Sequence, residues 1–227
     1  MYWLPLGAGG WFIRLNGRIN ERVLALREHR PALDLYHSAL EVRVPEGRFV
    51  IENAWPIPDA DGASRGVVVE GPVGSPALAR LRALRYEVRR WRDGRIPDVA
   101  YAVASPQHVS VAVDQARRLL ELVSWVPPLR WGRDELGIRD MWNSNSVVSW
   151  LLESSGLPAE HIRPPQGGRA PGWRAGLELA RARPPTLRTA WTEQGAPDAM
   201  DHGRASVANR SSRTLDRKIP FRSLIGR

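Results

Sequence analysis

The sequence predicts an α+β fold in which a small antiparallel sheet packs against helices. Two stretches alternate apolar and polar residues on either side of a Pro-Glu-Gly turn, which is typical of a β-hairpin. Later stretches repeat apolar residues every three or four positions, which is typical of amphipathic helices. The chain has 227 residues, of which 43% are hydrophobic, so it can bury a core of its own.

These two spacings define the expected elements along the chain. Alternation with period two predicts the strands, and recurrence every three or four residues predicts the helices. In chain order we expect a strand over 11–15, a helix over 20–29, hairpin strands over 36–44 and 48–55, a strand over 66–70, a short helix over 75–83, a strand over 84–92, and helices over 113–125, 145–155 and 173–182.

Turn-forming residues justify the boundaries of these elements. Pro45-Glu46-Gly47 separates the two hairpin strands, and Asp93-Gly94 follows the last strand. Pro127-Pro128 cannot continue a helix and therefore ends the helix before it. Gly156 is suited to close the next helix because glycine readily takes the left-handed conformation found after helix ends.

The length is accounted for by one domain and a tail. Residues 1–183 contain every expected strand and helix. Beyond Pro184 the sequence is rich in Arg, Ser and Pro and has few apolar residues, a composition typical of disorder. We therefore expect an α+β domain over 1–183 and a disordered tail over 184–227.

Composition excludes several kinds of chemistry. The chain has no cysteine, which excludes disulfides, thiolate metal sites and a cysteine nucleophile. No stretch is apolar enough to cross a membrane, and residues 1–13 lack the features of a secretory signal. We expect a cytoplasmic protein, with peripheral membrane contact as an alternative.

No cofactor or metal site is expected from the sequence. The glycine-rich loop over 167–172 neither follows a strand nor ends in Lys-Ser/Thr, as a phosphate-binding loop would. Asp140 and Asp134-Glu135 have no histidine spaced beside them, so we expect a solvated loop there.

The net charge of +9 comes almost entirely from arginine, with Lys218 the only lysine. Arginine binds phosphates and carboxylates through two parallel hydrogen bonds. A basic tail over 184–227 could therefore bind nucleic acid or anionic lipid.

Ser144 is the candidate nucleophile because it lies in a run of small polar residues directly before an apolar helical pattern. Free backbone N–H groups and the helix dipole stabilise negative charge at such a position, and Asn143 and Asn145 flank it. The alternative is that these residues only cap the helix, since Asn and Ser are preferred N-cap residues. Trp142 and Tyr36 are the residues expected to line the cleft.

His37 and Glu52 are the candidate base and its orienting partner. They lie in the two hairpin strands, so strand pairing could bring them together, and a carboxylate beside a histidine supports a general base. A change of one residue in register would replace Glu52 by Glu41 or Asn53 as the partner.

Three pieces occur in order in the chain: YHSALEV, FVIENAWPI and NSNSVVSWLL. This arrangement resembles the circularly permuted branch of the NlpC-like, papain-fold hydrolases and acyltransferases, in which a histidine strand precedes a cysteine helix. Three motifs, NSNS, RGVVVEGPVG and GGRAPGWRAG, resemble more closely a set of actinobacterial proteins from which no activity is implied. The papain-like resemblance covers residues 36–156 and implies a permuted papain-like architecture. It matches Ser144 to the nucleophile position, His37 to the base and Glu52 to the orienting residue.

The departure from that family is serine in place of cysteine at position 144. An alkyl hydroxyl is a much weaker nucleophile than a thiolate unless a base removes its proton. The sequence therefore favours a pseudoenzyme that binds a small-molecule, peptide or acyl-lipid ligand. The alternatives are an active serine hydrolase or acyltransferase using Ser144, His37 and Glu52, and a basic nucleic-acid or membrane-surface binder.

Overall fold

The computed structural model describes residues 1–6, 21–22, 25–27, 29–56, 66–109 and 111–182. The chain divides into one unit over residues 1–187 and a second over 188–227, and the described residues all belong to the first. The strand expected over 11–15 and the tail expected over 184–227 lie outside the described residues. Residues 21–22 and 25–27 are helical, in agreement with the helix expected over 20–29.

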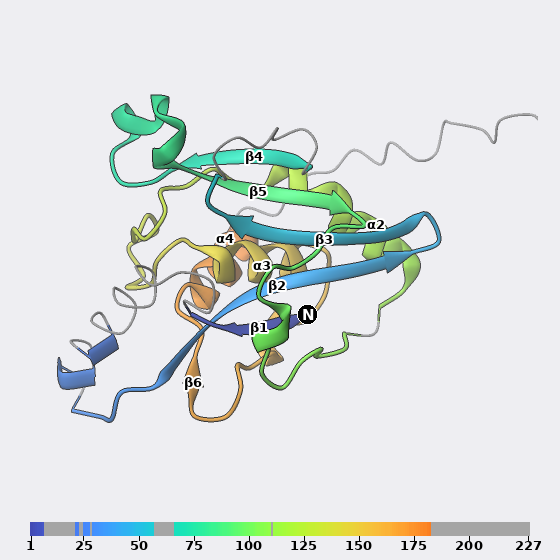
Figure 1. The fold of residues 1–227 in the computed structure, drawn as a ribbon. Helices are drawn as coiled ribbons and strands as arrows, with labels where there is room; N and C mark the ends of the chain where they lie inside the picture. The colour runs from blue at the N-terminus through green and yellow to red at the C-terminus, as the bar shows by residue number, and fades with distance from the viewer. Residues whose placement is uncertain (7–20, 23–24, 28, 57–65, 110, 183–227) are drawn as a thin grey trace, which may run out of the picture. The chain divides into compact units, whose positions relative to one another are not determined.

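The described strands form one sheet in the order β1-β2-β3-β5-β4, with β6 paired beside the start of β2 (Figure 1). Pairing is antiparallel except between β6 and β2. The strands are β1 (Tyr2–Pro5), β2 (Asp34–Val44), β3 (Gly47–Ala54), β4 (Val67–Pro72), β5 (Arg85–Arg92) and β6 (Gly168–Arg169). The predicted hairpin is confirmed, because β2 and β3 pair through Val44 and Gly47 at their turn.

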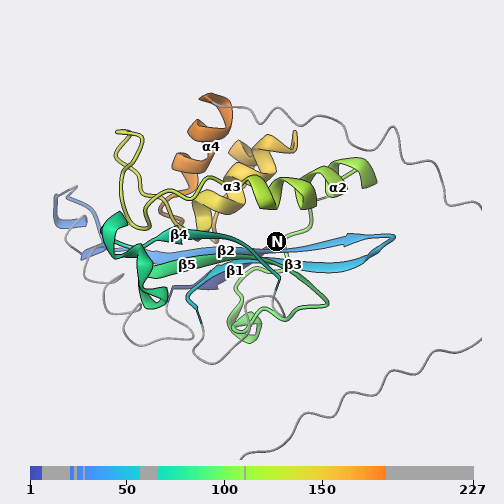
Figure 2. The same cartoon turned by 90° about the horizontal axis from the view of Figure 1, so that it is seen from above.

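The three longer helices lie on one side of this sheet (Figure 2). They are α2 (Val113–Leu122), α3 (Ser144–Ser154) and α4 (Trp173–Ala182). The expected short helix over 75–83 consists of two 3-10 helices, η2 (Pro76–Arg80) and η3 (Arg82–Leu84), and further ones are η4 (Val99–Tyr101), η5 (Val123–Trp125) and η6 (Ala159–His161). In the described residues, no helix is both long and apolar enough to cross a membrane.

The main hydrophobic core lies between the sheet and α3. Nine of the eleven residues of α3 are buried, from Ser144 to Leu152, because the helix packs against the sheet, α2 and α4. A helix buried on all sides needs apolar or small residues around its circumference, and the sequence SNSVVSWLL supplies them. The predicted α+β fold is therefore confirmed.

The two faces of β2 pack against different parts of the chain. Leu40 and Val42 belong to the main core with the helices, and Ser38 also faces α3, where its hydroxyl bonds to Asn145. Ala39 belongs to a smaller core that includes Ile96. Side chains alternate between faces along a strand, so residues 37, 39 and 41 face away from the helices. The segment that follows β5 covers that second face (Figure 2).

Helix α4 approaches α3 closely at Gly176. A Cβ atom at Gly176 would lie 2.1 Å from the carbonyl oxygen of Ser146 and 2.1 Å from Ser149 Oγ. The Ser149 hydroxyl in turn donates a hydrogen bond to the carbonyl of Trp173 at 2.8 Å. The absence of a side chain at position 176 thus sets the distance between the two helices.

We expect Gly176→Ala to destabilise the fold by about 1–3 kcal/mol, because α4 must move away from the backbone of α3. Helix propensity alone would give the opposite sign, a gain of about 1 kcal/mol. Urea unfolding followed by circular dichroism measures the change. Arg174→Ala, at an exposed position of the same helix, serves as the control and should stay within about 0.5 kcal/mol. A more stable Gly176→Ala variant would contradict the close contact.

Candidate functional site

The start of α3 is capped by the side chain of Asn143. Its Oδ1 accepts hydrogen bonds from the backbone N–H groups of Asn145 at 2.9 Å and Ser146 at 3.4 Å. Ser146 completes the capping box, because its hydroxyl accepts a bond from the N–H of Asn143 at 3.0 Å. Two of the backbone donors at the start of α3 are therefore used by the cap. The capping role expected as the alternative is confirmed.

Asn145 connects this helix start to β2 and to the loop before α4. Its Oδ1 accepts a hydrogen bond from the Ser38 hydroxyl at 2.9 Å. Its Nδ2 donates to the carbonyls of Tyr36 at 2.9 Å and Pro171 at 2.8 Å. Asn143 Nδ2 also donates to Pro171, at 2.9 Å. The NSNS motif is thus a buried polar cluster that joins three separate segments.

The structure does not bring His37 to Ser144. Ser38 faces α3, as its hydrogen bond to Asn145 shows, so the neighbouring His37 points to the other face of the sheet. Asp98, on the segment that follows β5, interacts electrostatically with His37. Within the described residues no hydrogen bond reaches the Ser144 hydroxyl. The expected Ser144–His37 pair is corrected by this strand alternation, because the sheet separates the two side chains.

The environment of His37 also weakens it as a base. Burial lowers the pKa of His37 to about 4, although the Asp98 carboxylate opposes this effect. A group with so low a pKa is a poor proton acceptor near neutral pH. His37 is therefore a neutral, packed side chain at pH 7.

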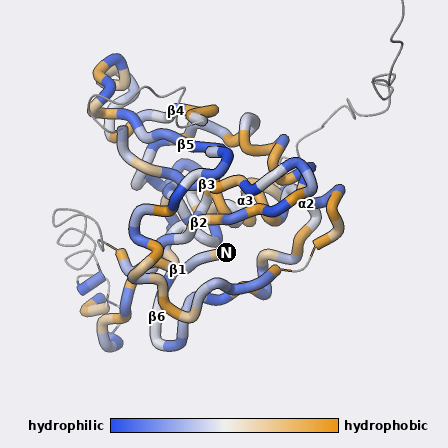
Figure 3. The backbone as a smooth tube through the Cα atoms, turned by 45° about the vertical axis from the view of Figure 1, so that its right-hand side comes forward, coloured by the Kyte–Doolittle hydropathy of each residue, from blue (hydrophilic) through white to orange (hydrophobic). Residues whose placement is uncertain are grey.

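Glu52 forms an ion pair with Arg89 on the sheet. Arg89 Nη1 lies 2.9 Å from Glu52 Oε1, and Arg89 Nη2 lies 2.6 Å from Glu87 Oε2. Arg89 and Glu87 are each 2% exposed. The hydrophilic sequence of β5, blue in Figure 3, reflects this buried cluster. The predicted role of Glu52 as orienter of His37 is corrected, because its carboxylate binds the guanidinium on the neighbouring strand.

The two alternative orienters do not reach His37 either. The carboxylate of Glu41 binds Arg43 at 2.8 Å and Arg48 at 3.2 Å. Asn53 lies next to Glu52 on β3 and hence on the opposite face, and both polar atoms of its amide are buried with no hydrogen-bonding partner. Neither Glu41 nor Asn53 is therefore placed as the orienting partner of His37.

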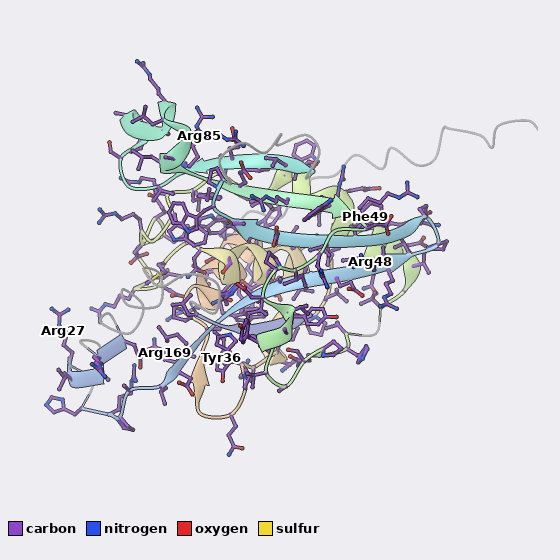
Figure 4. The ribbon with its side chains drawn as sticks, viewed as in Figure 1. Arg27, Tyr36, Arg48, Phe49, Arg85 and Arg169 are labelled. Atoms are coloured by element: carbon purple, nitrogen blue, oxygen red, sulfur yellow. The ribbon has the colours of Figure 1, made fainter. Side chains whose placement is uncertain are left out.

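The residues expected to line a cleft belong to the core. Trp142 is 1% exposed and donates its indole N–H to the Tyr86 hydroxyl at 3.1 Å. Tyr36 lies at the start of β2 (Figure 4), and a Cβ atom at Gly168 would lie 2.3 Å from its ring. Both aromatic side chains therefore stabilise the packing, and the prediction that they line a cleft is corrected.

Sequence reasoning missed Ser38, which bonds to Asn145 of the NSNS cluster, and Asp140, which binds backbone N–H groups near the start of α4. The Asp140 carboxylate accepts hydrogen bonds from the backbone N–H groups of Gly172 at 2.7 Å and Ala175 at 3.2 Å, at the start of α4. Alternation along β2 could have identified Ser38, because it places Tyr36 and Ser38 on one face of the strand and His37 on the other. Asp140 gave no such signal, since its partners are 32 and 35 residues away.

Comparison of the chain with protein-family models, curated proteins and solved structures gives no match. The resemblance to permuted papain-like hydrolases therefore stays a prediction. In the part of the chain that the structure describes, no group of three or more His, Cys, Asp or Glu residues could hold a metal ion.

We expect Asn145→Ala to lower the free energy of unfolding by about 3 kcal/mol, because buried hydrogen-bonding groups of Ser38 and Tyr36 lose their partner. Ser144→Ala is the matched control and should cost less than about 1 kcal/mol, since it removes no hydrogen bond of the cluster. Chemical denaturation of both variants compares the two positions. A larger loss of stability in Ser144→Ala than in Asn145→Ala would contradict the conclusion that Asn145 holds the cluster together.

We expect Arg89→Met to destabilise the fold by about 3–5 kcal/mol, because the buried carboxylates of Glu52 and Glu87 lose the buried cation between them. Arg82, which is half exposed and lies 3.5 Å from Glu87, remains as a weaker partner. Arg43→Met is the control. It also removes an arginine partner of a glutamate, Glu41, but the Arg43 side chain is 78% exposed, so the free energy of unfolding should change by less than about 1 kcal/mol. Thermal unfolding of the two variants provides the comparison. Equal losses of stability in the two variants would show that the buried ion pairs of Arg89 contribute no more than an exposed pair.

Proposed function

We propose that this chain is a ligand-binding domain, a non-catalytic relative of amide and ester hydrolases, rather than an active serine hydrolase. The observation that carries the proposal is that His37 lies on the face of the sheet opposite Ser144, since Ser38 beside it faces α3, and the cap of α3 adds to it, with Asn143 Oδ1 accepting from Asn145 and Ser146. An oxyanion that drew on the N–H groups of Asn145 and Ser146 would have to displace these bonds.

The position of His37 supports the same proposal. A serine nucleophile needs a base within hydrogen-bonding reach of its hydroxyl. His37 points away from α3, and its low pKa of about 4 makes it a weak base. Binding needs neither a base nor a free oxyanion site.

The proposed ligands are small molecules, peptides or acyl lipids, the classes that the sequence resemblance implies. The nucleic-acid and anionic-lipid alternative rests on residues 184–227, which lie outside the described residues. The cytoplasmic location likewise stays a prediction.

A fluorophosphonate probe tests the absence of a serine nucleophile. We expect no adduct by intact mass on the wild type or on Ser144→Ala, because no described group activates the hydroxyl. Ser144→Cys should leave hydrolysis of an activated ester at background, since it restores a thiol but no base. A serine esterase labelled in parallel shows that the probe is active.

One result would overturn the proposal. Labelling of the wild type that disappears in Ser144→Ala would establish Ser144 as a nucleophile. Circular dichroism of both variants would show that the loss comes from the hydroxyl and not from unfolding.

A further inference from the structure

A pocket of about 450 Å³ lies beside the start of α4. Pockets of this size hold small organic ligands. Arginines from three segments line it: Arg139 from the loop before α3, Arg163 and Arg169 from the connection between α3 and α4, and Arg174 from the first turn of α4. Arginines from separate segments that converge on one cavity indicate a site for an anion.

The two carboxylates in the lining are already bound elsewhere. Asp140 accepts the backbone N–H groups of Gly172 and Ala175. Glu160 binds Arg181, which lies outside the lining, at 2.5 Å. Arg163 also helps to lower the pKa of Glu160, but four arginines against two carboxylates leave the lining an excess of positive charge.

Arg139, Arg163 and Arg174 retain donors for a ligand, whereas Arg169 lies 3.7 Å from the buried carboxylate of Glu21. Within the described residues no hydrogen bond or ion pair engages the Arg139 side chain. Arg174 lies 3.7 Å from Glu178 on the surface of α4, and Arg163 donates only to the backbone carbonyls of Glu160 and Ile162. Charged donors that lack a strong internal partner lose little on binding an anion.

The backbone positions of these arginines are fixed before any ligand arrives. Arg139 has a φ of 63°, a conformation that costs free energy for a residue with a side chain. The Asp134 carboxylate holds it there by accepting the N–H groups of Ile138 at 3.0 Å and Arg139 at 2.8 Å. Arg169 is held by β6, which pairs with β2 (Figure 4). Such preorganisation reduces the entropy lost on binding.

We propose that this pocket binds a small phosphate monoester, an inference that rests on the proposed ligand-binding function. A phosphate monoester carries nearly two negative charges and three acceptor oxygens at neutral pH, which matches several converging arginines better than a carboxylate does. Pro171, Trp173 and Leu177 give the pocket an apolar side for the organic part of the ligand.

Calorimetric titration of the full chain with phenyl phosphate, and with benzoate as the matched carboxylate, tests this site. Phenyl phosphate should bind at least about tenfold more tightly than benzoate, and Arg139→Gln and Arg174→Gln should each weaken it about tenfold. Arg118→Gln changes the net charge equally at an exposed position of α2 and should have no effect. Circular dichroism checks the fold of each variant.

Several results would overturn the proposal: no binding of phenyl phosphate, equal binding of benzoate, or an equal loss in Arg118→Gln. Vesicles containing phosphatidate and a 5′-phosphorylated oligonucleotide are tested in parallel. If either binds while phenyl phosphate does not, the pocket is not a site for small monoesters.

Release of inorganic phosphate, measured in the same samples, separates this inference from the proposed function. Phosphate release that requires Ser144 would contradict the non-catalytic proposal even if the pocket binds. A protein that is inert to the fluorophosphonate probe and does not bind phenyl phosphate would contradict the pocket alone.

Discussion

The side chain of Asn145 connects the sheet to the helical layer through buried hydrogen bonds. It accepts from Ser38 on β2 and donates to Pro171 in the loop before α4. Because a buried polar group without a partner is costly, these bonds allow few alternative arrangements of the three segments. Asn143 donates to the same Pro171 carbonyl, so the starts of α3 and α4 are positioned together. Gly172 follows directly, and a Cβ there would lie 2.3 Å from Asn143 Oδ1, which explains the glycine in the GGRAPG loop.

The sheet separates two polar regions that the sequence suggests are one. On the helical face lie the NSNS residues and Ser38, whereas the other face carries the ion pairs of Arg89 with Glu52 and Glu87. The Ser144, His37 and Glu52 pattern, which resembles a hydrolase site, is thus divided between the two faces of the sheet. The residues on each face have structural roles of their own. The serines and asparagines cap and join elements, and the glutamates compensate a buried arginine. This division is the physical reason why we favour binding over catalysis.

Local patterns predicted the fold well, and pairings between distant segments could not be predicted. The hairpin over 36–55 and the helix over 173–182 follow from short-range periodicity and turn residues, which act within a few positions. The capping role of Asn143 is equally local. The contact of Glu52 with Arg89 depends on which strand lies beside β3, and nothing within either strand specifies it. The arginine pocket was missed for the same reason, because Arg139 and Arg174 line one pocket only once α4 has packed on α3.

The long sequence separation between Ser38 and Asn145 has a consequence for the order of folding. These two residues are 107 positions apart, whereas the strands of the hairpin are joined by a two-residue turn at Pro45-Glu46. Closing a long loop costs more chain entropy than closing a short one, so distant contacts form after local ones. We therefore expect the hairpin to form early, and the asparagine bonds to form only when most of the chain is in place. Until then the apolar surface of α3 is exposed to other molecules, which makes this step the one most sensitive to protein concentration.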